Sequence, residues 1–262
     1  MPVFERLVTG PLGRKAPREA LAGLLDIMAG LAADPFTLCS AMVFLAERYG
    51  EPMERWDDDL PKPVRRQLDS LLRLQQVQAE NVDGAATTEA GASAEGLRRL
   101  LLALVSDVRV VLIALGWQLV QLRGAKGDPE RAERLARETM LIHAPLANRL
   151  GVWQLKWELE DLAFRFSEPD EYRRIAKQVA ERRADREAFI RDFIDRLDGI
   201  LAEAGIAGEV KGRPKHIFSI YRKMKRKEID IKDLFDLRAV RVLVGDVPAC
   251  YSVLGLVHTH WQ

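Results

Sequence analysis

Residues 211–227 read KGRPKHIFSIYRKMKRK and mark the point at which the character of the chain changes. The stretch holds eight Lys or Arg residues and no acidic residue, whereas the whole chain of 262 residues has 40 basic and 39 acidic side chains. The cluster is therefore a local concentration of positive charge in a nearly neutral protein. Such a concentration is typical of a polyphosphate site, of a solvated basic face or of a patch that contacts RNA.

The spacing inside this stretch predicts a helix over residues 214–225, whose apolar side is expected to pack on a sheet. Pro214 suits the first turn, because the N–H that it lacks would have no partner there. Positions at steps of four share one side of a helix, and here they are two Lys residues and a Ser. Mobile ammonium groups, a hydroxyl and a guanidinium fork are suited to grip a chain of phosphates. The residues predicted to do so are Arg213, Lys215, Ser219 and Lys223.

Two short strands and a second helix are predicted around the basic stretch. Residues 208–211 predict a strand, residues 237–244 a buried strand, and residues 248–261 a helix. Asp236 lies at the start of the second strand, next to many cations, where a carboxylate can hold Mg²⁺ against triphosphate oxygens. A salt bridge from Asp236 to Arg238 or to the basic helix explains the same spacing.

Before Gly205 the pattern is helical. Asp34 and the proline after it predict the start of a helix, and residues 167–170 predict another, with Ser167 as its hydroxyl cap. Residues 108–115 fit either a buried helix or a strand. Residues 81–96 are small and polar and are expected to form a mobile loop. An all-helical region therefore leads into an α/β region.

Composition limits the compartment in which the protein works. The two cysteines, Cys39 and Cys250, are far apart in sequence and each lies among apolar residues, which predicts buried free thiols in a reducing compartment. No apolar run approaches the roughly 20 residues that span a bilayer, and the N-terminus lacks the apolar core of a signal peptide. We expect a cytoplasmic protein that does not bind membranes.

Several long motifs resemble one known family. Residues 143–161, HAPLANRLGVWQLKWELED, resemble the linker of long RelA/SpoT-type alarmone synthetases. Residues 212–224 and 234–241 resemble the opening motifs of their synthetase domain. The resemblance implies a mainly α protein with a helical HD-like domain, a helical linker and the incomplete start of an α/β nucleotidyltransferase-like synthetase domain. The implied boundaries are residues 1–142, 143–204 and 205–262.

The resemblance also implies an activity. The family transfers pyrophosphate from ATP to the 3′-hydroxyl of GTP or GDP, which makes the (p)ppGpp of the stringent response. By this resemblance Arg213, Lys215, Ser219 and Lys223 bind ATP phosphates, and Asp236 is the catalytic carboxylate that holds Mg²⁺. The guanine-site segment and a second metal-binding carboxylate are expected beyond Gln262, so the chain alone is expected to be inactive. The full-length family also binds the ribosome and uncharged tRNA through domains outside these residues.

One part of the family pattern is missing. Bifunctional members hydrolyse the alarmone in their helical domain with a His, a His-Asp pair and a later Asp around Mn²⁺. This chain has no histidine before His143, and the stretch that resembles the site of the later Asp reads IALGWQL over residues 113–119, with Trp117 where the Asp is expected. The resemblance therefore implies a degenerate hydrolase domain without Mn²⁺, as in the synthesis-only RelA branch. The alternative is a non-catalytic regulatory or interaction module formed by this domain.

Overall fold

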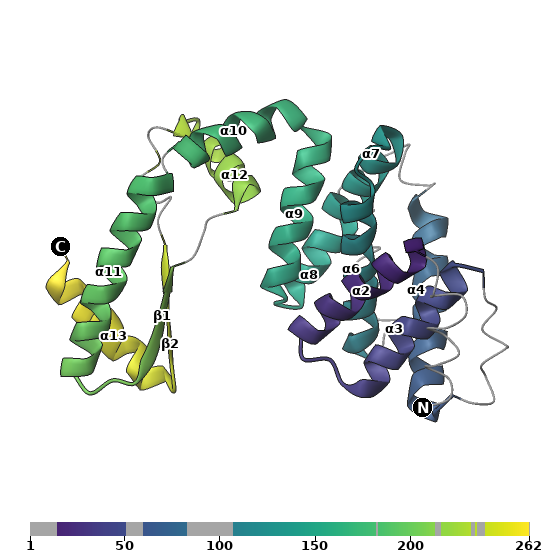
Figure 1. Ribbon diagram of the computed structural model, residues 1–262, viewed down its shortest axis with the longest axis horizontal. Helices are drawn as coiled ribbons and strands as arrows, with labels where there is room; N and C mark the ends of the chain where they lie inside the picture. The colour runs from purple at the N-terminus through teal and green to yellow at the C-terminus, as the bar shows by residue number, and fades with distance from the viewer. Residues whose placement is uncertain are drawn as a thin grey trace. The chain divides into compact units, whose positions relative to one another are not determined.

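The structure is a computed structural model that describes residues 15–50, 60–82, 107–181, 183–212, 216–231, 234 and 239–261. The chain divides into two compact units, with the boundary between Ser167 and Glu168 (Figure 1). The predicted linker, residues 143–204, is thus distributed over both units: its first part belongs to the helical unit and its remainder to the second unit.

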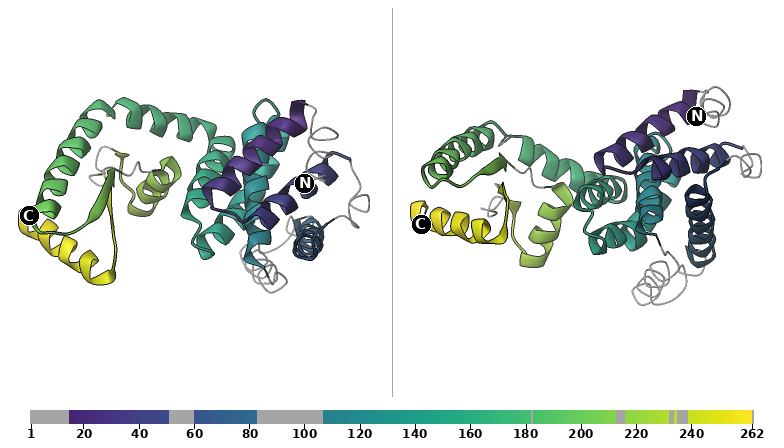
Figure 2. Two further views of the ribbon diagram at one scale, coloured as in Figure 1. Left: turned by 60° about the horizontal axis from the view of Figure 1, so that its bottom comes forward. Right: turned by 90° about the horizontal axis from the view of Figure 1, so that it is seen from below.

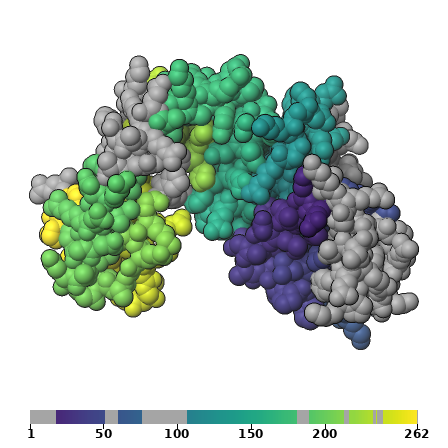
Figure 3. Space-filling model, in the orientation of Figure 1, coloured from purple at the N-terminus to yellow at the C-terminus, as the bar shows by residue number. Residues whose placement is uncertain are grey.

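The first unit is helical throughout its described residues. Its predicted amphipathic segments are confirmed as helices, and the proline that follows Asp34 stands at the first turn of its helix. The elements are α2 (Lys15–Gly30), α3 (Pro35–Arg48), α4 (Lys62–Val82), α6 (Val108–Gly124), α7 (Pro129–Glu138), the π-helical turn η5 (Thr139–His143), α8 (Ala144–Arg149) and α9 (Trp153–Ser167). In the space-filling view, α2 and α3 form one continuous surface in purple and blue (Figure 3).

Helix α6 is the centre of this unit. Residues 108–115, for which the sequence allowed either a helix or a strand, belong to it. The segment is helical, because the Asp107 carboxylate accepts the backbone N–H of Arg109 and so caps the first turn. Helices α2, α3, α4, α7 and α9 all contact α6. A helix with neighbours on several sides is apolar on several sides, which explains why its sequence reads like a buried strand. Its buried side chains include Val110, Ile113 and Leu115.

The second unit combines helices with a two-stranded antiparallel ribbon. Its elements are α10 (Pro169–Glu181), α11 (Arg183–Glu203), β1 (Gly208–Gly212), α12 (Ile217–Lys227), β2 (Val240–Val244) and α13 (Val247–His260). The strands predicted over residues 208–211 and 237–244 therefore both form, and the helix predicted over residues 248–261 is confirmed. In the register of the ribbon, Val210 lies opposite Val242 and Gly212 lies opposite Val240.

Helices α11 and α13 cover one face of this ribbon (Figure 2). The core beneath them consists of Leu197, Leu201 and Val253, with Val210 and Val242 packed against it. At the end of α13 the Trp261 ring lies 4.6 Å from the Phe193 ring, measured between centroids, and the Arg196 guanidinium lies over the same indole at 5.0 Å. The opposite face of the ribbon is exposed, and Leu243 on that face keeps 49% of its surface accessible.

Four details of the predicted secondary structure and packing are wrong. Strand β2 begins at Val240 and alternates between half-buried and exposed residues instead of being buried, because helices cover one face only. Ser167 is the last residue of α9, and the Glu168 carbonyl accepts the first N–H of α10, from Tyr172, so Glu168 occupies the cap. The Cys39 thiol is buried as predicted, whereas Cys250 on α13 is exposed.

The fourth correction concerns the basic helix. It begins at Ile217 with His216 as its cap, because His216 has the extended backbone of a cap residue, with φ −67° and ψ 144°. Among the described elements it packs mainly against α10, whereas the prediction placed it on the sheet. The predicted mobile loop lies outside the described residues from position 83 onward, and its first two residues, Asn81 and Val82, end α4.

Candidate functional site

The basic helix α12 carries the part of the predicted phosphate site that the structure describes. The Ile220 N–H donates to the His216 carbonyl over 3.1 Å and closes the first turn. The helix ends at Glu228, which adopts the left-handed conformation with φ 52° and ψ 41° and donates its N–H to the Met224 carbonyl. A second N–H, from Ile229, reaches the same carbonyl over 3.2 Å. Both ends are thus fixed by the backbone.

One side of α12 is committed to packing. Phe218, Ile220 and Met224 are buried, and α10 brings the fully buried Ile175 to this part of the unit. Ser219 and Lys223 are half-buried and follow each other at a step of four, so they lie along one row of the helix surface. The structure therefore confirms that these two positions share a row on one helix.

Aromatic rings support two further cations of α12. The Arg222 guanidinium lies 6.0 Å from the centre of the Phe218 ring, and the Lys225 ammonium lies 5.7 Å from the centre of the Tyr221 ring. A cation over an aromatic face is attracted by the ring quadrupole. The two rings therefore hold Arg222 and Lys225 at the edge of the apolar face.

The remaining predicted site residues, Arg213, Lys215 and Asp236, lie outside the described residues, as does Arg238. Because α12 begins at Ile217, Lys215 precedes the cap in the chain, and the predicted line of four-residue steps holds within the helix only for Ser219 and Lys223. The helix start was placed too early because the proline rule states where a helix can begin and not where it does.

The register of the ribbon nevertheless connects these segments. Gly212, the last residue of β1, pairs with Val240, the first residue of β2. The chain therefore leaves β1 toward Arg213 and enters β2 from Asp236 at the same end of the ribbon. This end of the ribbon and the start of α12 are therefore joined by short connections.

In the helical unit, two aromatic rings pack together at Trp117, the position where the hydrolase pattern has a metal-binding Asp. Trp117 on α6 meets Phe44 on α3 edge-to-face, with ring centroids 6.2 Å apart and an interplanar angle of 84°. Phe44 is buried, and Trp117 packs against the same apolar cluster. Neither side chain offers an oxygen or imidazole ligand. Within the described ranges, no group of three or more His, Cys, Asp or Glu side chains is placed to hold a metal ion.

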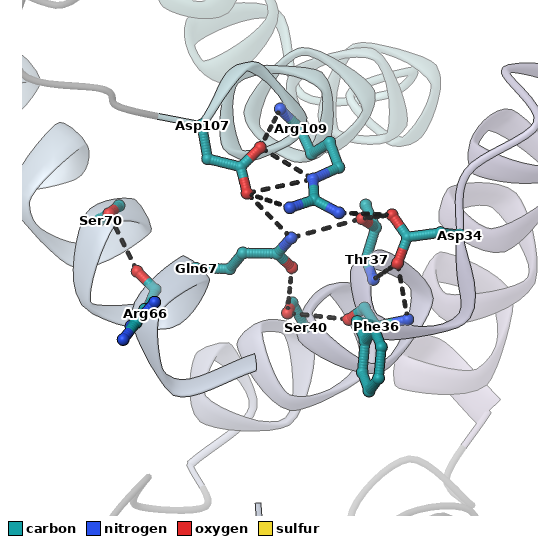
Figure 4. Close-up of polar contacts among 9 residues, drawn as sticks. All are labelled: Asp34, Phe36, Thr37, Ser40, Arg66, Gln67, Ser70, Asp107 and Arg109. Atoms are coloured by element: carbon teal, nitrogen blue, oxygen red, sulfur yellow. Dashed lines mark hydrogen bonds and ion pairs between the residues drawn. The ribbon is translucent and has the colours of Figure 1, made fainter. Parts of the chain in front are cut away.

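A polar network that the sequence did not predict joins α3, α4 and α6 (Figure 4). Asp34 caps α3 by accepting the N–H groups of Phe36 and Thr37, and Asp107 caps α6. The Arg109 guanidinium bridges the two carboxylates, with N–O distances of 3.0 Å to Asp34 and 2.7 Å to Asp107. The two helix starts are thereby tied to each other.

Gln67 of α4 completes this network from a buried position, with 2% of its surface exposed. Its amide nitrogen donates to Asp107 over 3.2 Å, and its amide oxygen accepts the Ser40 hydroxyl over 2.6 Å. The hydrogen bond from the Thr37 hydroxyl, helped by Arg109, lowers the pKa of Asp34 to about 2. The hydrogen bonds from Arg109 likewise lower the pKa of Asp107. The apolar run after Asp107 indicates a cap, but no local pattern points to Gln67.

A second buried polar group lies where α7 changes into the π-helical turn η5. The Gln118 amide of α6 donates to the Thr139 hydroxyl over 3.0 Å, and this hydroxyl donates to the Leu135 carbonyl over 2.6 Å. His143 at the end of η5 is buried, with its Nε2 atom 3.8 Å from Glu138. Burial lowers the pKa of His143, and the charge of Glu138 partly opposes this shift. The wide turn thus accommodates polar side chains inside the unit.

Two family models match the chain. Residues 16–153 match the HD domain, which is more than half of the chain. The helical unit is therefore an HD domain, in agreement with its predicted fold class. Residues 212–262, which include the last residue of β1 and all of α12, β2 and α13, match the region found in RelA / SpoT proteins. The chain belongs to the RelA/SpoT family.

Relatives of known name cover both parts. The chain is 39% identical over 255 residues to a GTP pyrophosphokinase of Photobacterium angustum, and 40% identical over 247 residues to a GTP pyrophosphokinase of Escherichia coli K12. These matches cover 97% and 91% of this chain and 34% and 32% of the relatives, so the chain spans about a third of their length.

A relative with a different name matches as well. The chain is 44% identical over 167 residues to a probable guanosine-3′,5′-bis(diphosphate) 3′-pyrophosphohydrolase of Synechocystis, over 63% of this chain and 22% of that protein. The question of hydrolysis therefore depends on the residues of the HD domain itself. Among the described residues, no helix is both long and apolar enough to cross a membrane.

Proposed function

We propose that this chain is the nucleotide-binding part of a (p)ppGpp synthetase, in which α12 and the adjoining end of the ribbon hold the phosphates of ATP. Ser219 and Lys223 contribute the hydroxyl and ammonium of the α12 row, and Arg213 and Lys215 contribute from the connection before the helix. Pyrophosphate then passes from ATP to the 3′-hydroxyl of GTP or GDP. The full-length synthetase works in the cytoplasm as part of the stringent response and also engages the ribosome and uncharged tRNA.

The observation that carries this proposal is the row of Ser219 and Lys223 on α12, a helix whose two ends are fixed by backbone hydrogen bonds and which follows β1 closely in the chain. Phosphoryl-type transfer needs charge neutralisation and in-line placement more than covalent chemistry, and cations on a rigid helix supply both. The match of residues 212–262 and the names of the relatives favour the same chemistry.

Mg²⁺ belongs to this proposal as the partner of the ATP phosphates, whose negative charge it would neutralise when bound. The described polar row of α12 contains no acidic residue, so a protein carboxylate for the ion has to come from the segment after the helix. We assign this role to Asp236. In the chain, Asp236 comes shortly before β2, and Arg213 directly follows β1.

Isothermal titration with ATP and Mg²⁺ tests the assignment. Since a hydrogen bond to a charged group contributes about 1.5–3 kcal/mol, Lys223→Gln should weaken binding at least tenfold, and Ser219→Ala should weaken it less. Lys177→Gln, which removes an exposed cation from α10, is the matched control and should leave binding unchanged. Equal losses in Lys223→Gln and Lys177→Gln would show that ATP does not bind along the α12 row.

Product formation is a separate question. We propose that residues 1–262 bind ATP without transferring pyrophosphate, because they correspond to only about a third of the synthetases they match. Radiolabelled ATP with GTP or GDP and the chain alone should give no labelled product, whereas a protein extended with the following residues of a relative should give it. Transfer by the 262 residues alone would refute this part, and loss of transfer on Asp236→Asn in the extended protein is expected.

For the HD domain we propose a structural or regulatory role without hydrolysis and without Mn²⁺, as in the synthesis-only branch of the family. The supporting observation is the Trp117–Phe44 contact, because two aromatic rings pack together where a metal carboxylate is expected. An assay of ppGpp hydrolysis with added Mn²⁺ should show no release of pyrophosphate. Stoichiometric Mn²⁺ together with hydrolysis would contradict the proposal.

A further inference from the structure

The last turn of α12 carries three consecutive cations, Lys225, Arg226 and Lys227, all exposed. We call them the basic turn. In the part of the chain that the structure describes, none of the three forms an ion pair; Lys225 lies over the Tyr221 ring. The proposed ATP site uses Ser219 and Lys223, which precede the last turn of the helix, so the basic turn has no assigned role.

The basic turn continues the positive charge of α12 by one further helical turn beyond Arg222 and Lys223. Arg226 follows Arg222, and Lys227 follows Lys223, each at a step of four, so the two pairs form neighbouring rows with about 6 Å of rise between members. Five basic and two acidic residues lie between Arg222 and Asp230. The acidic residues, Glu228 and Asp230, come only after the helix has ended.

The form of this surface favours a phosphate backbone over a lipid surface. Membrane-bound basic helices insert an apolar face next to their cations. In α12 that face is used inside the protein, because Phe218, Ile220 and Met224 are buried. Base stacking is not favoured either, since the two aromatic residues of the helix, Phe218 and Tyr221, already lie beneath cations. Exposed cations in rows without free aromatic faces suit contacts to successive phosphates.

We propose that the basic turn binds the phosphate backbone of a nucleic acid without reading its sequence. The contacts are ionic, so affinity follows the number of phosphates neutralised and falls steeply with salt. Because phosphate contacts neither use the 2′-hydroxyl nor reach base edges, RNA and DNA of equal length should bind alike. This binding uses residues other than those assigned to ATP, which are Ser219 and Lys223 on the preceding turns of the helix.

Fluorescence anisotropy with a labelled 20-nucleotide single-stranded RNA, and with DNA of the same sequence, tests the proposal on the 262-residue chain. Replacing all three cations (Lys225→Gln, Arg226→Gln and Lys227→Gln) should weaken binding at least tenfold at 50 mM salt. It should also reduce the slope of log affinity against log salt by about 2, since each neutralised phosphate of a single strand contributes about 0.7. The affinity of the triple variant for ATP with Mg²⁺ should change less than twofold.

The matched control removes three exposed cations from the neighbouring helix α10, with Arg173→Gln, Arg174→Gln and Lys177→Gln. Arg173 and Arg174 already pair with Asp170 and Glu171, so this equal change of charge should lower RNA affinity much less. Because lysine and arginine in a last turn also complement the helix dipole, far-UV circular dichroism of both variants should show unchanged helix content.

Three outcomes would overturn the proposal. Equal loss in the two triple variants would show a general effect of net charge. Tighter binding of phosphatidylglycerol vesicles, or equally tight competition by polyglutamate, would show that the basic turn recognises negative charge in a lipid or a protein instead. Loss of ATP affinity in parallel with RNA affinity would place the three cations in the nucleotide site.

Discussion

The network at the starts of α3 and α6 allows a quantitative prediction for Asp107→Ala. This change removes the helix cap, which is worth about 1 kcal/mol. It also removes the carboxylate acceptor of the buried Gln67 amide and leaves that amide a longer hydrogen bond of 3.5 Å to the Thr37 hydroxyl. A buried polar group that loses a partner costs about 1–3 kcal/mol. The free energy of unfolding of the helical unit should therefore fall by about 2–4 kcal/mol. The loss of the Arg109 pairing adds little, because that guanidinium is 44% exposed.

Two comparisons isolate the buried part of this loss. Asp246 caps α13 through the Ala249 N–H over 2.8 Å and, among the described residues, accepts no hydrogen bond from a buried amide. Asp246→Ala should therefore cost only about 1 kcal/mol. In a background of Gln67→Met, which removes the amide, Asp107→Ala should cost about the same as that exposed cap. The two changes at Asp107 and Gln67 should thus be non-additive by about 1 kcal/mol or more.

Urea unfolding followed by far-UV circular dichroism measures the wild type and the four variants under one condition. The slope of free energy against urea should stay constant across the set, which would show that the folded and unfolded states remain comparable. If the losses at Asp107 and Gln67 add within about 0.3 kcal/mol, the two side chains do not act as a unit, and the argument from the buried amide is refuted.

Two further predictions concern the interior of the helical unit. Because burial lowers the pKa of His143 in the folded state, the unfolded chain binds more protons, and the free energy of unfolding should fall as the pH decreases through about 6.5. His143→Gln should flatten this dependence of the free energy of unfolding on pH. An unchanged slope in the variant would exclude His143 as the cause. A Cβ at Gly116 would lie 2.8 Å from Met28 Cε and 3.0 Å from Leu24 Cδ1 of α2, so Gly116→Val should cost about 1–3 kcal/mol by overpacking. Thermal unfolding measures that change, with Gly124→Val, where no atom lies within 4 Å, as the control, and equal losses in both variants would point to helix propensity instead.

The sequence predicted the elements of this protein better than their partners. The helix starting after Asp34 and the helix at the end of the second unit follow from caps and prolines, which act locally. The sequence correctly predicted that α12 has a buried apolar side. It placed that side on the sheet, whereas the main partner of the helix is α10. An amphipathic pattern predicts that one face of a helix is buried, but it does not predict which element buries that face.

Strand β2 shows the same limit. Its run of Val and Leu is compatible with burial on both faces or on one. The number of covered faces depends on where α11 and α13 pack, and only Val240, Val242 and Val244 face them. Of the candidate site, the sharing of a row by Ser219 and Lys223 could be predicted from spacing. The connection of Arg213 and Asp236 to one end of the ribbon could not, because it follows from the pairing of Gly212 with Val240.

Gly212 gives this ribbon end a further property. A Cβ on Gly212 would lie 2.8 Å from Ile190 Cγ2 of α11, so the backbone that leads into the basic segment rests directly on that helix. A displacement of α11 would therefore move the end of β1 directly, because Gly212 has no side chain between its backbone and the helix. A bulkier residue at 212 would push the strand end and α11 apart in the same way.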